Sequence, residues 1–226
     1  MLVCLLFTGT IYFFHRQSVN RILAVEVLRQ KVARDLHDDM GSTLSTINIL
    51  SAMAKNKLTE DPAKTSEYLT KISDNSTRMM EAMDDIVWSI NPANDSMDKI
   101  VARMRSFATE VLEVKDIDLD FRVDNNIYAA HLNMEQRRDF FLIYKEAVNN
   151  MAKYAHCKKV RIALSFSQQA LVLSMEDDGI GFEVEKANSG NGLTNMQKRA
   201  ESLGGTFILD SKIGKGTSIR LQVALH

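Results

Sequence analysis

The chain has 226 residues, of which 45% are hydrophobic and 25% are charged, a balance that is ordinary for globular domains. This length is enough for one domain of usual size and a smaller one. The formal net charge is -1, so no overall electrostatic attraction draws the chain to nucleic acid, and we expect no direct nucleic-acid binding. Cys4 and Cys157 have neither zinc-site nor disulfide spacing, and two free thiols are typical of a reducing compartment.

The N-terminal segment departs from this balance. Residues 1–14 are almost wholly apolar and are followed by His15 and Arg16. As a helix they would be about 21 Å long, whereas a bilayer core needs roughly 30 Å. We interpret residues 1–16 as the inner end of a transmembrane helix, because the basic residues that follow would then lie on the cytoplasmic side of the inner membrane, with the rest of the chain in the cytoplasm. A signal peptide is the alternative, but no small-residue cleavage site is evident.

Two long helices are predicted next. Residues 18–57 contain no proline and one glycine, Gly41, and their apolar residues recur at spacings of three and four. A turn is predicted over residues 59–62, and a second periodic segment ends before Pro92, which should stop the helix. Two such helices form an antiparallel hairpin. Since one hairpin buries only one face of each helix, we predict a dimeric four-helix bundle.

The periodicity then changes. Ser96 is the expected N-cap of a short helix that reaches about Val114. Apolar and polar residues alternate from Ile117 to Val123, which predicts a strand. The rest of the chain predicts an α+β sandwich, with helices on one side of a sheet. Its further segments are helices over residues 133–155 and 192–203 and strands over residues 160–166, 170–176, 206–210 and 217–223.

His37 is the first candidate for chemistry. It follows Leu36 of the apolar stripe, and the turn of about 100° per residue places it on the flank of that stripe. An imidazole is partly neutral near pH 7 and can act as a nucleophile, while Asp38 could fix its tautomer and accept a proton. A solvated helix face with one histidine among charged residues is the alternative, and for an isolated His-Asp pair it is favoured.

A polar helix face is the second candidate. Glu146, Asn150 and Lys153 recur at helical spacing and share one face. An amide oxygen suits Mg²⁺, which also binds substrate phosphates, and a lysine neutralises phosphate charge. The alternative is an ordinary polar face with a salt bridge between Glu146 and Lys153.

Asp177, Gly179 and Gly181 follow directly after a predicted strand. Glycines let the backbone approach a ligand closely, and a carboxylate at a strand end can accept a hydrogen bond from an exocyclic amine such as that of adenine. A tight turn between strand and loop is the alternative.

Two further glycine motifs follow. Gly190 and Gly192 precede and open a predicted helix, where free N–H groups suit phosphate and a short segment could act as a lid. A flexible loop before a helix is the alternative. Residues 214–217, Gly-Lys-Gly-Thr, predict a hairpin turn and do not match the Walker pattern.

The order of these motifs resembles that of two-component sensor histidine kinases. The order is His-Asp on a long helix, Glu-x-x-x-Asn-x-x-Lys, Asp-x-Gly-x-Gly, Gly-x-Gly-Leu and Gly-x-Gly-Thr, from residue 33 to the C-terminus. The segment around His37 is similar to the subfamily that pairs with LuxR/NarL-type response regulators. The resemblance implies a dimerising helical hairpin followed by an α/β sandwich with a Bergerat-type ATP site.

The resemblance also implies roles for individual residues. His37 would be phosphorylated from ATP, and the phosphoryl group would pass to an aspartate of a response-regulator receiver domain. Asp38 and Glu146 would assist catalysis, and Asn150 would bind Mg²⁺. The implied ATP-binding set is Asn150, Lys153, Tyr154, Asp177, Gly179, Gly181, Gly190, Gly192, Leu193 and Thr217.

The implied division of the chain has five parts. They are the membrane segment 1–16, a helical linker 17–34, the dimerisation and phosphoacceptor domain 35–92, a connecting helix 93–114 and the ATP-binding domain 115–226. The sequence departs from the family pattern at Ser42, where glutamine linked to phosphatase activity is frequent. It also departs at Tyr154 and Asp178, where histidine and asparagine are common.

Two other classes of protein compete with this interpretation. One is a different ATPase with the same nucleotide fold, such as an Hsp90- or MutL-like machine or a serine kinase that acts on an anti-sigma antagonist; it predicts no phosphoacceptor helix before the ATP domain. The other is a dimerising scaffold without activity, which predicts a disrupted Asn150 or disrupted glycine pairs. The sequence leaves open the signal, the partner regulator and whether phosphate moves within a subunit or across the dimer.

Overall fold

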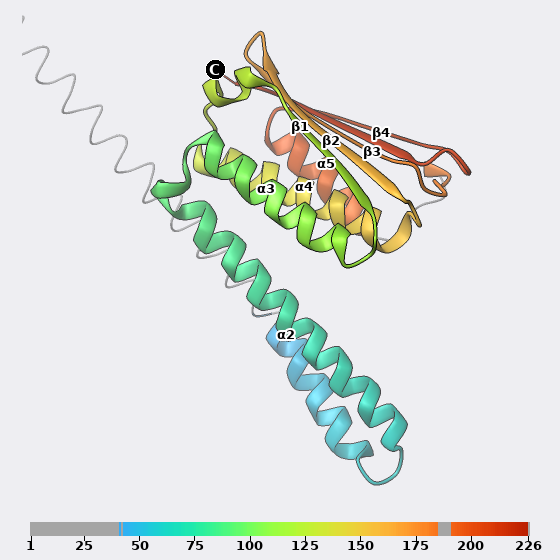
Figure 1. Cartoon of the computed structure of the whole chain (residues 1–226). Coiled ribbons are helices and arrows are strands. Elements are labelled where there is room, and N and C mark those ends of the chain that lie inside the picture. Colours follow the sequence, from blue (N-terminus) through green and yellow to red (C-terminus); the bar gives the residue numbers. More distant parts are fainter. Residues whose placement is uncertain (1–40, 42, 185–190, 226) are drawn as a thin grey trace, which may run out of the picture. The chain divides into compact units, whose positions relative to one another are not determined.

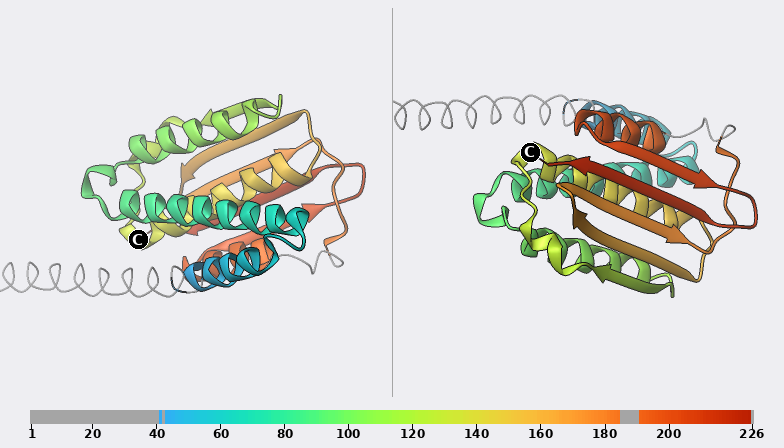
Figure 2. Two further views of the ribbon diagram at one scale, coloured as in Figure 1. Left: turned by 90° about the horizontal axis from the view of Figure 1, so that it is seen from below. Right: turned by 90° about the horizontal axis from the view of Figure 1, so that it is seen from above.

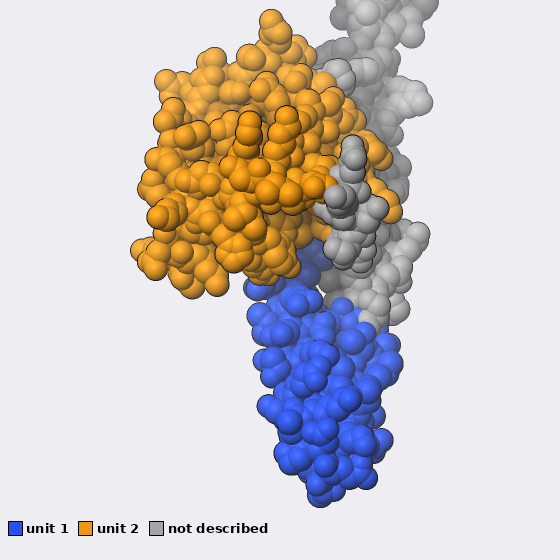
Figure 3. Space-filling view, turned by 90° about the vertical axis from the view of Figure 1, so that its right-hand side faces the viewer, with its two compact units in different colours: residues 1–86 blue, residues 87–226 orange. Residues whose placement is uncertain are grey.

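The computed structural model describes residues 41, 43–184 and 191–225 (Figure 1). The chain forms two compact units, residues 1–86 and 87–226, which Figure 3 shows in different colours. Cys157 is a free, buried thiol as expected, whereas Cys4 lies outside the described residues.

The first unit contains all of the predicted helical hairpin except the last turn of its second helix. Residues 43–57 are helical, residues 58–60 form a turn, and helix α2 runs over Pro62–Ile90. The Asp61 carboxylate accepts the Lys64 N–H at 3.0 Å and so caps the start of α2. Thr65 and Tyr68 are buried, which fixes the side that α2 turns toward the preceding helix. The predicted turn and the stop before Pro92 are both confirmed.

The second unit is built on a five-stranded sheet in the order β1-β2-β3-β5-β4. β1 and β2 are parallel, and all other neighbours are antiparallel. Three helices cover one face of the sheet, as Figures 1 and 2 show. The strands are β1 (Asp118–Val123), β2 (Lys159–Ser167), β3 (Ala170–Asp177), β4 (Thr206–Ser211) and β5 (Thr217–Ala224), and the helices are α3 (Met97–Glu113), α4 (Met134–Tyr154) and α5 (Asn191–Ser202).

One hydrophobic core joins the sheet to these helices. Strand β3 buries alternate residues, Leu171, Leu173 and Met175, as the period of a strand requires. Helix α3 buries Ile100 and Met104 at helical spacing. The predicted α+β arrangement, with helices on one side of the sheet, is confirmed.

The helix starts match the sequence patterns in one case and differ in the other. At α4, Asn133 and Gln136 form a reciprocal capping box with bonds of 2.9 and 3.0 Å. At α3, Ser96 occupies the N-cap position as predicted, but its side chain makes no capping hydrogen bond. The short 3-10 helices η1 (Pro92–Asn94) and η2 (Asn125–Ala129) were not predicted.

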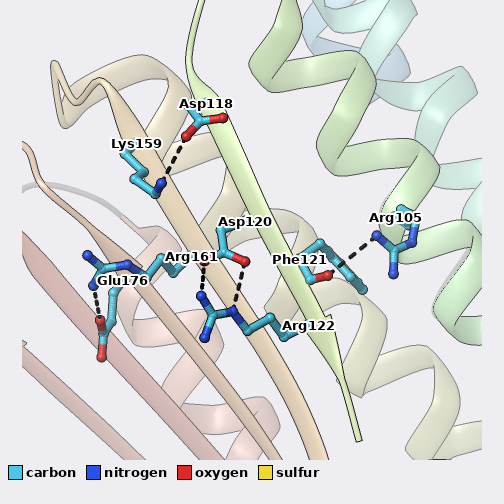
Figure 4. A network of polar contacts seen from close by, with 8 residues as sticks. All are labelled: Arg105, Asp118, Asp120, Phe121, Arg122, Lys159, Arg161 and Glu176. Carbon is cyan, nitrogen blue, oxygen red and sulfur yellow. Dashed lines mark hydrogen bonds and ion pairs between the residues drawn. The ribbon is translucent and has the colours of Figure 1, made fainter.

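The other face of the sheet carries charged side chains, drawn in Figure 4. Ion pairs join Asp118 to Lys159 at 3.0 Å and Arg161 to Glu176 at 3.2 Å across neighbouring strands. Arg122 pairs with Asp120 on its own strand at 2.6 Å. All of these side chains except Asp120 are largely exposed, so the ion pairs keep the face hydrated and contribute little to stability.

No helix within residues 43–184 or 191–225 is both long enough and apolar enough to cross a bilayer. The membrane segment predicted over residues 1–16 lies outside the described residues.

Candidate functional site

A cavity of about 580 Å³ opens at one end of the second unit. Helix α4 forms one wall, the loop after β3 forms another, and the start of α5 and strands β4 and β5 complete it. The cavity is lined by Glu146, Ala147, Asn150, Met151, Tyr154, Ala155, Asp177, Ile180, Gly181, Phe182, Gly192, Leu193, Leu209, Thr217 and Ile219.

Helix α4 presents its polar residues to this cavity. Glu146, Asn150 and Tyr154 recur every four residues and all line it. Ala147 and Met151 lie beside them and are buried, so they form an apolar wall next to the polar groups. This combination suits a ligand with an apolar ring and a polar tail.

Asp177 lies at the end of β3 and is nearly buried. Its carboxylate accepts the Gly179 N–H at 2.9 Å. Burial raises the pKa of this carboxyl above its ordinary value, while hydrogen bonds from the Gly179 N–H and from Thr217 act in the opposite direction. A desolvated carboxylate at the cavity wall is a strong acceptor for a ligand N–H group.

The loop after Asp177 is fixed by close backbone contacts. At Gly179 a Cβ atom would lie 2.1 Å from the Ala155 carbonyl oxygen. Gly181 has a φ of +60°, and a Cβ there would lie 2.1 Å from the Lys212 carbonyl oxygen. Only glycine fits both the positive φ and this approach, so these glycines hold the cavity's shape.

Ser211 is a positioning residue that the sequence interpretation missed. Its hydroxyl accepts the Phe182 N–H at 2.9 Å and lies 3.0 Å from the Thr217 hydroxyl. The Gly214 N–H also donates to the Ile180 carbonyl at 2.6 Å. The hairpin between β4 and β5 is thereby bonded to the loop after β3. The feature of the sequence that could have indicated this role is the pair of hydroxyl residues, Ser211 and Thr217, on either side of the predicted hairpin turn.

The start of α5 lies directly against α4. A Cβ atom at Gly192 would lie 2.2 Å from the Glu146 Oε1 atom, so a larger residue there would displace the Glu146 carboxylate. Further along, the Arg199 guanidinium donates to the buried Asp139 carboxylate at 3.0 Å. Glycine at one end and an ion pair at the other hold α5 on α4.

The predicted site residues divide into three groups. Eight of them line the cavity together, as given above. Lys153 is exposed on α4 and is not among the lining residues, and Gly179 is buried directly behind the cavity wall. His37, Asp38 and Gly190 lie outside the described residues.

Several apolar lining residues were not predicted as part of the site. Leu209 of β4 and Ile219 of β5 are adjacent in the sheet register, and Ile180 and Phe182 flank Gly181. The alternation of apolar and polar residues in β4 and β5 indicated which side chains of these strands face the core. It did not indicate that some of those side chains also line a cavity.

Two family models match the chain. The model of the histidine kinase-, DNA gyrase B- and HSP90-like ATPases matches residues 135–226. A histidine kinase model matches residues 29–95. The first covers every described residue of the cavity, and the second covers the helical hairpin and the segment around His37.

Curated relatives carry similar names. The chain is 29% identical over 210 residues to the signal transduction histidine-protein kinase/phosphatase UhpB of Salmonella typhimurium, covering 92% of this chain and 41% of that protein. It is 25% identical over 202 residues to the sensor histidine kinase DesK of Bacillus subtilis, covering 86% of this chain and 50% of that protein. The chain thus spans at most about half the length of these two relatives.

Solved structures share the fold. The histidine kinase AdeS of Acinetobacter baumannii superposes with a TM-score of 0.56 at 15% identity, over 80% of this chain and 95% of that chain. The kinase domain of a blue-light activated histidine kinase of Erythrobacter litoralis gives a TM-score of 0.55 at 16% identity, over 80% and 96%.

Proposed function

The chain belongs to the histidine kinases, and from this premise we propose that it phosphorylates its own His37 from ATP and passes the phosphoryl group to an aspartate of a response regulator. The observation that supports this proposal best is the cavity in which Asn150 of α4 and Asp177 of β3 face the same space. One supplies a ligand for a phosphate-bound cation, and the other supplies an acceptor for an adenine amine.

The cavity suits ATP in a defined orientation. The adenine would lie against Met151, Ile219 and the Asp177 carboxylate, where burial strengthens the hydrogen bond to its amine. The phosphates would then extend toward Asn150 and the start of α5. Lys153, exposed one turn away on α4, would contact the phosphates from outside the cavity.

The residues present fit a magnesium ion. Glu146 and Asn150 offer one carboxylate and one amide oxygen on the same wall, and Mg²⁺ takes few protein ligands because it keeps waters and binds phosphate oxygens. When bound, the ion would neutralise phosphate charge during transfer. Glu146 would then orient the attacking imidazole or hold its proton, with Asp38 as the second acidic group.

We further propose the partners and the placement of the chain. An exposed apolar stripe on α2 supports dimerisation through the hairpin: Leu69, Met80 and Met83 are 55%, 59% and 37% exposed and lie near one helix face. A LuxR/NarL-type regulator is the proposed acceptor, and residues 1–16 the proposed attachment to the inner membrane.

The domain boundaries belong to the same proposal. They are a linker over residues 17–34, a phosphoacceptor domain over 35–92, a connecting helix over 93–114 and an ATP-binding domain over 115–226.

Incubation with γ-labelled ATP and Mg²⁺ tests the proposal. We expect an acid-labile, alkali-stable label on the chain, because phosphohistidine has that stability. His37→Gln should abolish the label, since no nucleophile remains at that place. His131→Gln is the matched control, because His131 is an exposed histidine of the second unit. Equal labelling of His37→Gln and the parent would refute the assignment.

A second pair of variants separates the acceptor from the nucleotide site. Asn150→Ala should lose the label while it stays folded, because a cation ligand is removed from the cavity. Asn149→Ala is the control, since Asn149 is the adjacent residue of α4 and does not line the cavity. Full labelling of Asn150→Ala would exclude the magnesium role.

A further inference from the structure

The last turn of α2 is part of the second compact unit, which begins at Val87. Ser89 is 2% exposed, as deeply buried as the core. The helix therefore does not simply end in a linker at Asn91 and Pro92. Its final residues are packed into the unit that carries the candidate nucleotide site.

Arg137 of α4 holds this turn. Its side chain is 1% exposed, and its guanidinium donates to the Ser89 carbonyl and to the Asp95 carboxylate. Ser89 is in the last turn of α2, where carbonyls have no partner within the helix. A buried guanidinium without these two acceptors would be strongly unfavourable, so the contact is specific for this position of the turn.

Trp88 provides the apolar half of the same contact. Its ring centroid lies 6.0 Å from that of Phe141, one turn along α4 from Arg137. The Arg103 guanidinium lies over both rings, 4.3 Å from the Trp88 centroid and 4.6 Å from the Phe141 centroid. The Asn94 side-chain amide donates to the Trp88 carbonyl at 3.0 Å. We name Trp88, Ser89, Asp95 and Arg137 the α2 clasp.

From this geometry we propose that Arg137 is a positioning residue for phosphoryl transfer, which keeps the last turn of α2 on the ATP-binding unit throughout the reaction. The proposal rests on the proposed function, in which ATP bound to the second unit must reach His37. Any movement that brings the two together would then bend α2 upstream of Val87 rather than at Asn91 and Pro92.

The clasp and the nucleotide cavity lie toward opposite ends of α4. Arg137 and Asn150 are separated by about 20 Å of helix at 1.5 Å per residue. Loss of the clasp should therefore leave ATP binding intact and slow the transfer step. This separation of binding from rate distinguishes positioning from a loss of folded structure.

The test uses Arg137→Met in the full chain, with the dimer and the N-terminal residues present. We expect ATP affinity within about twofold of the parent and a labelling rate roughly tenfold to 100-fold lower, as misplaced reacting groups cause. Arg122→Met is the matched control, because Arg122 is exposed on β1 and its ion pair is local. Asp95→Asn, on the exposed side of the clasp, should give a smaller loss of rate and guards against misfolding of the first variant.

Trp88 is the single tryptophan of the chain and reports on the clasp directly. Its emission should shift to the red in Arg137→Met and stay constant in the parent when ATP and Mg²⁺ are added. Parent-like labelling by Arg137→Met, a parallel loss of ATP affinity and rate in both clasp variants, or a shift of parent emission during turnover would each overturn the proposal. A parent that takes no label at all would instead refute the proposed function.

Discussion

Asp177 and Asp178 are adjacent carboxylates in opposite environments. Burial raises the pKa of Asp177, and the negative charge of Asp178 raises it further. Asp178 is exposed, and the N–H groups of Lys159 and Lys158 lower its own pKa by hydrogen bonds at 2.9 and 2.8 Å. The pKa of Asp177 is higher in the folded protein than in the unfolded chain. Above the unfolded-state pKa, the ionised carboxylate therefore lowers the free energy of unfolding, and this destabilisation decreases as the pH falls through the folded-state pKa. A ligand amine would offset that cost.

Asp178→Asn separates the two roles of Asp178. The amide oxygen can still accept hydrogen bonds from the backbone N–H groups of Lys158 and Lys159. The negative charge beside Asp177 is gone, so the pKa of Asp177 should fall. Affinity for a fluorescent ATP analogue should then persist to lower pH than in the parent, because the Asp177 carboxylate stays ionised there. Titration of the analogue between about pH 4.5 and 7.5 measures this. Asp210→Asn is the control, and an unchanged or upward shift would contradict the prediction.

At the scale of single residues, the sequence predicted those site residues whose polar side chains recur at a fixed spacing along a helix. Glu146 and Asn150 were predicted to share a helix face, and both line the cavity. Ser211 was missed because its hydroxyl acts across 29 residues of chain, on the Phe182 N–H. Arg137 also gave no signal, since a buried arginine on α4 is defined only by the acceptors that the fold brings to it.

At the scale of elements, the attachment of α5 to α4 should govern nucleotide affinity. Asp139→Asn weakens the pair with Arg199, so α5 is held less firmly and Gly192 and Leu193 lose their fixed place in the cavity wall. We expect ATP affinity to fall about tenfold, with the maximal labelling rate little changed. This is the opposite pattern to loss of the α2 clasp.

A double-variant cycle with Arg199→Gln checks this prediction. Asp139→Asn and Arg199→Gln should be less than additive in ATP affinity, because both remove the contact between Asp139 and Arg199. Asp139→Asn also weakens the bond that Arg138 makes to the same carboxylate at 3.3 Å, and the cycle separates that effect from the shared one. Gln197→Ala is the control, since Gln197 bonds Glu201 within α5 itself at 3.0 Å. Full additivity, or an equal effect of the control, would contradict a role for the pair.

The elements themselves were largely predictable. Every helix and strand predicted from residue 59 onward is present within about three residues, because periods of 3.6 and 2 distinguish the two. The helices η1 and η2 are too short to have a period. The parallel pairing of β1 with β2 was not predictable either, since alternation indicates the buried side of a strand but not its neighbour.

At the scale of the whole molecule, the hairpin's apolar stripe predicts the state of assembly. Leu69→Glu with Met80→Glu places two charges on the proposed dimer surface, where their desolvation is unfavourable. We expect the variant to sediment as a monomer at concentrations at which the parent is a dimer. Val114→Glu is the control, because Val114 is 79% exposed in the second unit. A dimeric double variant would place the interface elsewhere.

The sheet order leaves β1 and β4 at the two edges, and they are protected differently. β1 carries Asp118, Asp120 and Arg122 on its open face, and charges of this kind oppose pairing with a strand from another molecule. β4 carries Ile208, 47% exposed, and the following turn carries Ile213, 68% exposed. Aggregation of this protein at high concentration should therefore begin at β4, and a lysine at position 208 is the change that would improve its solubility.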